Sequence, residues 1–245
     1  MTARRPDKPQ SPEPLRAVVF DLDGVLVDTE IWWYDVRVEF AAALGRQWTE
    51  PDRVAMMGLN TRQWRARMRE RLGVDMTEDE IERAGSDAML ARYATKGAPA
   101  IDGAVEAVRR LSGRYALAVA SSAPPQLIEA ALTGLGVRDL ISATASSDEV
   151  AAGKPAPDVF GLAARRLGID PAECLAVEDS LNGVLAARAA GMRVVLIPNA
   201  TIPPAAGARE GATYHLTSLR ELEPQGLAAS WIEPPPSVAK NAPAA

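Results

Sequence analysis

The chain has 245 residues, a formal net charge of −5, 47% hydrophobic residues and one cysteine, Cys174. This length suits one large α/β core with a modest insertion. The negative charge gives no electrostatic basis for nucleic-acid binding, no apolar run reaches the roughly 20 residues of a membrane helix, and a lone cysteine cannot form an intramolecular disulfide. We therefore expect Cys174 to be a buried thiol, and no nucleic-acid or membrane partner.

Residues 1–14 are polar and rich in Pro and Arg, without the apolar centre of a signal peptide. They predict a disordered tail and a cytoplasmic protein. The apolar run Ala17–Phe20 then predicts a buried strand, and Asp21 and Asp23 follow it. Alternate residues of an extended chain face the same side, so both carboxylates can share one reaction centre at the strand's carboxyl end. The alternative is a surface turn with solvated aspartates.

The stretch Asp-Leu-Asp-Gly-Val-Leu-Val-Asp-Thr at 21–29 resembles the first motif of the haloacid dehalogenase-like hydrolase superfamily. It is most similar to the helical-capped branch of sugar-phosphate phosphatases and β-phosphoglucomutases. The resemblance implies that Asp21 is the nucleophile, which becomes an aspartyl-phosphate, and that Asp23 is the general acid and base. It also implies that Gly24 lets the chain turn away without a Cβ blocking the phosphate, and that the protein is a monomer.

Residues 29–97 change from strand to helix character and predict a helical cap. The expected helices are 30–44, 50–57, 61–72 and 77–93. Thr77 and Glu80 form a capping-box pattern at the start of the last of these. Four helices without a strand between them predict a small domain inserted into the core, where it would act as a lid over the active site.

Strand and helix segments alternate again beyond residue 98. The expected strands are 115–120, 140–145, 174–178, 193–197 and 213–216, and the expected helices are 104–111, 126–134, 158–167, 183–190 and 218–222. Strands that are apolar on both faces predict an α/β fold with a parallel, Rossmann-like sheet covered by helices on both faces. We assign 15–28 and 98–223 to this core, and 224–245 to a disordered or loosely docked tail. The resemblance adds the strand order, with the first strand central and the fourth beside it.

Two further segments match motifs of the same superfamily. Ser121, Ser122 and Ala123 follow the second predicted strand, and the resemblance implies that the Ser121 hydroxyl and the next two amides hold phosphoryl oxygens at a helix N-terminus. An ordinary N-capping serine is the alternative for this segment alone. Lys154, in Gly-Lys-Pro, is implied to contact both the phosphoryl group and the Asp21 carboxylate.

Glu178 and Asp179 end the fourth predicted strand and resemble the superfamily's magnesium motif. The resemblance implies that Mg²⁺ is bound by Asp21, Glu178 and Asp179 together with the Asp23 carbonyl, since this ion prefers oxygen ligands. The cation and Lys154 would offset the repulsion between Asp21 and a phosphate dianion, which is roughly 4 kcal/mol at about 4 Å. The four motifs in their order predict a Mg²⁺-dependent phosphatase for a small phosphorylated metabolite.

A β-phosphoglucomutase is the main alternative, and an inactive phosphate-binding protein is another. The mutases that the chain resembles carry a cap histidine where this chain has Trp33, and a cap lysine where it has Met57. Both differences favour hydrolysis. The single histidine, His215, lies near the end of the predicted sheet, where a structural role is expected.

Three cap residues are candidates for substrate contact. Trp33 could stack on a sugar ring, Arg62 could contact a phosphate or hydroxyl group, and Glu30 lies at the core–cap junction. Packing in the cap is the alternative for Trp33, and solvation is the alternative for Arg62. The expected substrates are sugar, polyol or glycolate phosphates. Hinges near 28–30 and 97–101 would let the lid open.

Overall fold

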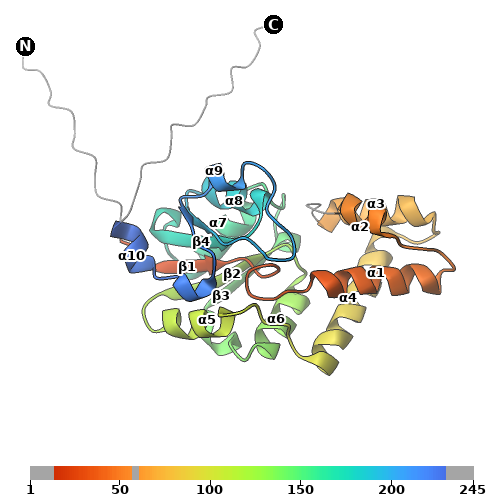
Figure 1. Ribbon diagram of the computed structural model, residues 1–245, viewed down its shortest axis with the longest axis horizontal. Helices are drawn as coiled ribbons and strands as arrows, with labels where there is room; N and C mark the ends of the chain where they lie inside the picture. The colour runs from red at the N-terminus through yellow and green to blue at the C-terminus, as the bar shows by residue number, and fades with distance from the viewer. Residues whose placement is uncertain (1–13, 57–60, 230–245) are drawn as a thin grey trace, which may run out of the picture.

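A computed structural model of the chain (Figure 1) describes residues 14–56 and 61–229. These residues form a parallel six-stranded sheet in the order β3-β2-β1-β4-β5-β6. The strands are β1 (Ala17–Phe20), β2 (Ala116–Ser121), β3 (Ala143–Ser146), β4 (Cys174–Glu178), β5 (Arg193–Leu196) and β6 (Tyr214–His215). The predicted parallel α/β fold is confirmed, and β1 lies centrally with β4 beside it.

Both faces of the sheet are buried by helices, and alternate strand residues point to opposite faces. Val18 and Phe20 of β1 pack in one cluster with the apolar faces of α5 (Ala104–Ser112) and α6 (Pro125–Gly134). Ala17 and Val19 pack in a second cluster with α7 (Asp158–Leu167) and α8 (Leu181–Ala189). Figure 1 shows these helix pairs on opposite sides of the sheet.

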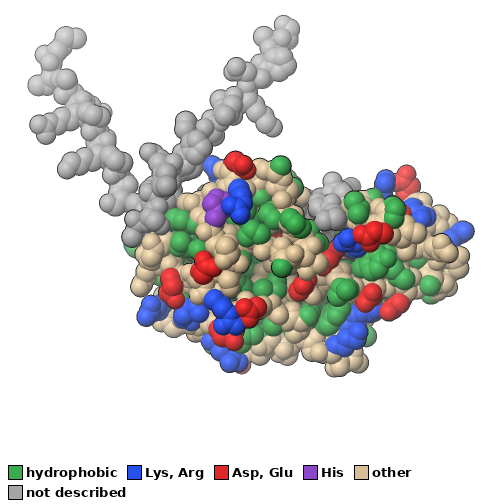
Figure 2. All heavy atoms as spheres, viewed as in Figure 1, with side chains coloured by type: hydrophobic (Ala, Val, Ile, Leu, Met, Phe, Trp, Pro, Cys, Tyr) green, Lys and Arg blue, Asp and Glu red, His purple; other side chains and the backbone are tan. Residues whose placement is uncertain are grey.

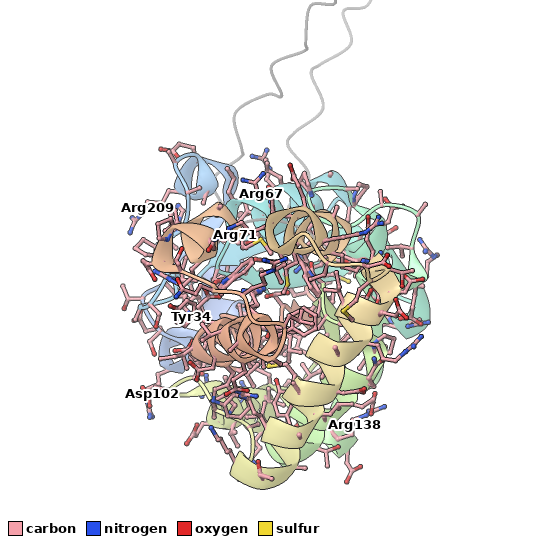
Figure 3. The ribbon with its side chains drawn as sticks, turned by 90° about the vertical axis from the view of Figure 1, so that its right-hand side faces the viewer. Tyr34, Arg67, Arg71, Asp102, Arg138 and Arg209 are labelled. Carbon is pink, nitrogen blue, oxygen red and sulfur yellow. The ribbon has the colours of Figure 1, made fainter. Side chains whose placement is uncertain are left out.

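The segment between β1 and α5 is helical. Its helices are α1 (Glu30–Ala43), α2 (Glu50–Met56), α3 (Thr61–Leu72) and α4 (Glu78–Lys96). They enclose an apolar cluster of their own, formed by Ala41, Trp48, Met56, Met68, Leu72 and Ile81. The view in Figure 3 places these helices in front of the core, with Tyr34, Arg67 and Arg71 on them. The Thr77–Glu80 capping box is present, with the Glu80 amide 3.2 Å from Thr77 Oγ1.

The two chain crossings between core and helical segment are paired through their backbones. The Asp28 amide donates to the Pro99 carbonyl at 2.9 Å, and the Ile101 amide donates to the Leu26 carbonyl at 3.1 Å. A β-bridge joins Val27 and Ala100 between them. The two crossings therefore form one narrow, hydrogen-bonded connection.

One predicted strand boundary was wrong, and one segment without a predicted element is a helix. The third strand begins at Ala143, not Leu140, because Leu140 belongs to a short 3₁₀ turn and packs against the core from there. The first part of the segment predicted to be a disordered or loosely docked tail is a helix, α10 (Pro224–Ala229), with Pro224 buried and Leu227 against the core. Proline at the first helical position and apolar residues three apart explain this helix. The rest of that predicted tail, from residue 230, lies outside the described residues; it includes Trp231 and Ile232, the apolar pair that could dock on the body.

The remaining elements complete the domain. A short helix α9 (Ala208–Gly211) precedes β6, and the predicted helix 218–222 is a 3₁₀ turn, Leu219–Glu221.

Cys174 is a buried free thiol, as predicted, whereas His215 is exposed on the edge strand. Among the described residues, none of the helices combines the length and apolar composition needed to span a bilayer. On the face shown in Figure 2, acidic and basic side chains are interspersed over the core and the helical segment.

Candidate active site

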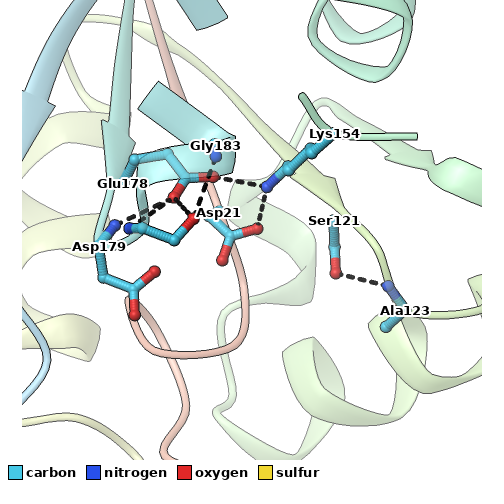
Figure 4. Close-up of polar contacts among 8 residues, drawn as sticks. Asp21, Ser121, Ala123, Lys154, Glu178, Asp179 and Gly183 are labelled. Carbon is cyan, nitrogen blue, oxygen red and sulfur yellow. Dashed lines mark hydrogen bonds and ion pairs between the residues drawn. The ribbon is translucent and has the colours of Figure 1, made fainter. Parts of the chain in front are cut away.

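The predicted carboxylates and lysine meet at the carboxyl edge of the two central strands. Phe20 of β1 pairs with Val177 of β4, so Asp21 and Glu178 lie next to each other where the strands end. Lys154 comes from the loop before α7, and its Nζ lies 2.5 Å from Asp21 Oδ1 and 2.6 Å from Glu178 Oε1 (Figure 4). All three side chains are buried. A buried cation between two carboxylates compensates charges that would otherwise be costly to bury.

The surroundings shift the pKa values of this triad. Burial alone would lower the pKa of Lys154, but attraction by Asp21 and Glu178 outweighs it and raises the pKa, so the ammonium stays charged. Burial raises the pKa of Asp21 to about 7, against the opposing effect of Lys154. The Asp21 carboxylate therefore depends on nearby positive charge to remain ionised near neutral pH.

Glu178 is held from two sides. Its Oε1 accepts from Lys154, while its Oε2 accepts from the Asp179 amide at 3.1 Å and from the Ser180 hydroxyl at 3.0 Å. Ser180 in turn caps α8 by accepting from the Gly183 amide at 3.1 Å. A Cβ on Gly183 would lie 1.7 Å from Glu178 Oε1. Glycine at this position lets the first turn of α8 pack directly against the buried carboxylate.

Three carboxylates form a group suited to a cation. Oxygen atoms of Asp21, Glu178 and Asp179 all lie within 4.8 Å of one another. Burial and the Glu178 and Asp21 charges raise the pKa of Asp179 well above its usual range. A hard divalent cation such as Mg²⁺ would relieve this repulsion, and its preferred ligands are carboxylate oxygens. The donor set therefore fits the ion.

The structure explains the glycine at position 24 by a close contact with Asp179, and not by room for the phosphate as expected. Its φ is +91°, and a Cβ there would lie 2.1 Å from Asp179 Oδ2. The side chain that a larger residue would displace is thus the Asp179 carboxylate. Gly24 allows the loop after β1 to approach this acid closely.

Asp23 occupies a separate environment from Asp21. Its Oδ1 accepts a hydrogen bond from the buried hydroxyl of Thr29, the residue before α1. Burial raises the pKa of Asp23, although the Thr29 hydrogen bond opposes this shift. A raised pKa suits an acid that must donate a proton near neutral pH.

The serine segment lies at the end of β2, next to β1 in the sheet: Ser121 is the last residue of the strand, and Ser122 and Ala123 follow it. Ser121 is buried, and its Oγ accepts from the Ala123 amide at 2.9 Å, so this amide already has a partner within the protein. The Ser146 hydroxyl donates to the Ala123 carbonyl at 2.7 Å. These contacts fix the loop that precedes α6, which begins at Pro125.

A cavity of about 430 Å³ joins most of the predicted site residues. Those that line it are Asp21, Asp23, Glu30, Trp33, Ser121, Ser122, Lys154 and Asp179. Glu178 and Ala123 lie outside the lining. Glu30 Oε1 lies 3.7 Å from the guanidinium of Arg53 on α2. Arg62 is in α3, but its side chain lies outside the described residues, as does Met57.

Comparison with known proteins shows which family this chain belongs to. A family model described as haloacid dehalogenase-like hydrolase matches residues 15–191. The chain belongs to the haloacid dehalogenase-like hydrolase family. Hexitol phosphatase B from Escherichia coli (strain K12) is 32% identical over 77% of this chain and 86% of its own. Fructose-1-phosphate phosphatase YqaB from the same strain is 33% identical, covering 75% and 96%.

A solved structure shares the fold of this chain. The crystal structure of CbbY from Rhodobacter sphaeroides in complex with phosphate aligns with a TM-score of 0.76, at 28% identity over 85% of this chain and 96% of that one. The predicted sugar-phosphate phosphatase branch is confirmed, and the chain is a phosphoric monoester hydrolase. The non-enzymatic alternative is thereby set aside.

Sequence reasoning missed part of the cavity wall of this hydrolase. Thr29 carries a detectable signal, since it ends the first motif beside Asp23. The segment after β5 carries none: Asn199 and 202–205 line the cavity, yet they lie beyond the motifs and read as an ordinary loop. Only the position of β5 beside β4 brings this segment to the site.

Replacing Gly183 with alanine should damage the site without touching a reacting group. The new Cβ would displace Glu178 and, through it, Lys154. We expect kcat/KM to fall on the order of 100-fold and the free energy of unfolding to fall by about 1–3 kcal/mol. Gly113→Ala is the matched control, because a Cβ there meets no heavy atom within 4 Å. Equal activities of the two variants would contradict the positioning role of Gly183.

Proposed function

We propose that this hydrolase is a Mg²⁺-dependent phosphatase that acts on a small phosphorylated metabolite through an aspartyl-phosphate on Asp21. The observation that supports this most is the contact of Lys154 Nζ with both Asp21 and Glu178, beside the carboxylate of Asp179. This arrangement gathers a nucleophile, a fixed cation and oxygen ligands at one end of the cavity.

In the first step, Asp21 Oδ attacks the phosphorus atom while the bond from phosphorus to the ester oxygen breaks. Asp23 gives its proton to the departing alkoxide, and its raised pKa keeps that proton available. Lys154 remains charged and offsets negative charge at the nucleophile and on the phosphoryl oxygens. The products of this step are the free alcohol and the aspartyl-phosphate.

In the second step, a water molecule attacks the aspartyl-phosphate and regenerates the Asp21 carboxylate with release of inorganic phosphate. Asp23, now ionised, accepts the proton of that water. Thr29 holds Asp23 by donating a hydrogen bond to its carboxylate. The same side chain thus serves as an acid in the first step and as a base in the second, because it has lost its proton by the time the water attacks.

Mg²⁺ would be held by Asp21 and Asp179, with the Asp23 carbonyl as a further oxygen donor. When bound, the ion supplies charge stabilisation for the phosphoryl oxygens. Glu178 is better placed to fix Lys154 and the Asp179 loop, since both of its oxygens already accept hydrogen bonds.

Removal of the divalent cation should abolish turnover reversibly. With excess EDTA we expect phosphate release to fall below about 1% of its initial rate, because Asp21 and a phosphate dianion would repel each other. Added Mg²⁺ should restore it, and thermal unfolding curves recorded in parallel should show that the fold persists. Full activity in EDTA would contradict the metal assignment.

Hydrolysis is favoured over the mutase alternative by Trp33. An indole lines the cavity on the cap side, at the position where the resembled mutases carry a titratable histidine. The deciding assay compares inorganic phosphate release with conversion of β-glucose 1-phosphate to glucose 6-phosphate. Phosphate release without isomerisation supports the phosphatase, and isomerisation faster than release would overturn it.

The substrates that we propose are sugar, polyol or glycolate phosphates. Relatives named for hexitol and fructose 1-phosphate hydrolysis support the first two classes. A panel of such esters, compared by kcat/KM with Mg²⁺, tests the assignment.

We also propose that 29–97 is a cap that moves about the paired crossings at 28–30 and 97–101. Monomeric state and cytoplasmic location stay predictions.

A further inference from the structure

The segment 199–205, which we call the core loop, forms a wall of the catalytic cavity that no sequence motif indicates. It follows β5, whose neighbour β4 carries Glu178 and leads into Asp179. Ile197 continues the pairing, since its amide donates to the Glu178 carbonyl at 2.8 Å. The chain then leaves the sheet at the same edge as the nucleophile and the metal ligands. Figure 1 shows this segment, in blue, beside the loop that follows β1.

The core loop is fixed by its own polar residues. Asn199 Oδ1 accepts from the amides of Thr201 and Ile202 at 2.6 and 3.2 Å, which closes a tight turn. Thr201 Oγ1 donates to Asp28 Oδ2 at 3.3 Å. Pro203 and Pro204 restrict the backbone that follows. The loop is therefore a built element, and it is tied to the core side of the crossing into the cap.

Apart from Asn199, whose Oδ1 accepts hydrogen bonds within the turn, the residues that the core loop presents to the cavity are apolar. Ile202, Pro203, Pro204 and Ala205 line it, and Trp33 of the cap lines the same cavity. Such side chains pack favourably against C–H groups and offer no hydrogen bond or ion pair to a charged group. Asp28 and Glu30 line the same cavity, and a carboxylate is able to accept hydrogen bonds from hydroxyl groups.

We propose that the core loop, with Ile202 at its centre, is a specificity determinant for the leaving group, which is an uncharged polyhydroxylated chain or ring. Its C–H groups would rest on Ile202 and the prolines, opposite the contacts made by the cap, and its hydroxyls would reach Asp28 and Glu30. The proposal rests on the proposed phosphatase function and narrows it. Because the loop belongs to the core, this part of the recognition surface would stay in place in the proposed cap movement.

The test compares two substrates in Ile202→Ala. One is the best six-carbon sugar or polyol phosphate of the panel, and the other is acetyl phosphate, whose leaving group is too small to reach the loop. We expect kcat/KM for the six-carbon ester to fall about tenfold, mostly through KM, while acetyl phosphate hydrolysis stays within about twofold of wild type. Leu185→Ala, which truncates an exposed leucine of α8, is the matched control and should change neither value.

Equal losses for both substrates, or no loss for either, would overturn the proposal, because Ile202 would then act only on folding or on nothing. Thermal unfolding of the variant checks the first of these outcomes directly. If wild-type protein with Mg²⁺ hydrolyses neither substrate, the proposed phosphatase function itself fails. If a phosphorylated carboxylic acid is the preferred substrate and Ile202→Ala leaves that preference unchanged, the phosphatase stands and the recognition surface proposed here is wrong.

Discussion

Asp21→Asn should abolish turnover while the protein stays folded. Asparagine matches aspartate in shape, but its amide does not form the acyl phosphate, so we expect kcat to fall by about 10⁴-fold or more. Lys154 would keep its 2.6 Å contact with Glu178. Burial already raises the pKa of Asp21 to about 7, so the folded state gains little from this charge and the free energy of unfolding should not decrease.

Three measurements check this expectation. Phosphate release gives the rate, thermal unfolding gives the stability, and mass spectrometry of acid-quenched protein detects the covalent phosphoryl group in wild type only. Asp139→Asn is the matched control, since Asp139 is exposed in the turn before β3 and far from the cavity lining. A variant at position 21 with more than about a tenth of wild-type activity would remove Asp21 from the role of nucleophile.

Lys154→Met should reduce both catalysis and stability. We expect kcat to fall on the order of 10³-fold, since the fixed ammonium no longer offsets charge on the phosphoryl group. Asp21 and Glu178 would also lose their shared buried cation, and breaking such a pair costs about 3–5 kcal/mol. Lys96→Met is the control, because Lys96 is an exposed lysine at the end of α4.

The stability loss in Lys154→Met should depend on pH with a definite sign. Lys154 lowers the pKa of Asp21, so its removal raises that pKa further above 7 in the folded protein, whereas unfolding returns it to its ordinary value. A carboxyl group with a raised folded-state pKa is destabilising once it ionises. Thermal unfolding should therefore show a larger deficit at about pH 8 than at about pH 5.5. A deficit independent of pH would contradict the charge argument.

Much of this molecule could be predicted from residue patterns alone. The apolar runs at β1, β2, β4 and β5 predicted buried parallel strands. Consecutive strand residues point to opposite faces, so an uninterrupted apolar run indicates a sheet that is covered on both faces. The capping box at Thr77 predicted a helix start that the structure confirms. The position of Asp21 and Asp23 after a buried strand marked them as candidates from the residues alone, whereas the resemblance to a known superfamily supplied the roles of Lys154 and Glu178.

The start of β3 and the helix α10, which residue patterns did not predict, depend on contacts from outside the segment. Leu140 has strand character, yet β3 begins at Ala143, where its pairing with Ala118 starts. Helix α10 forms beside Arg110, whose guanidinium lies 3.0 Å from Glu223 and binds the Leu219 and Leu222 carbonyls. Neither contact has a local signature in the sequence.

The amino-acid sequence by itself determined most of the helices and strands, because helix and strand periods and turn residues act over a few positions. Its motifs also marked the side chains that could carry phosphoryl transfer. The tertiary structure decided which of them meet. Lys154 and Asp21 are 133 residues apart, and only the placement of β1 between β2 and β4 brings their side chains together. The core loop enters the cavity for the same reason: the order of strands in a sheet is set by packing of the whole chain, which no single segment encodes.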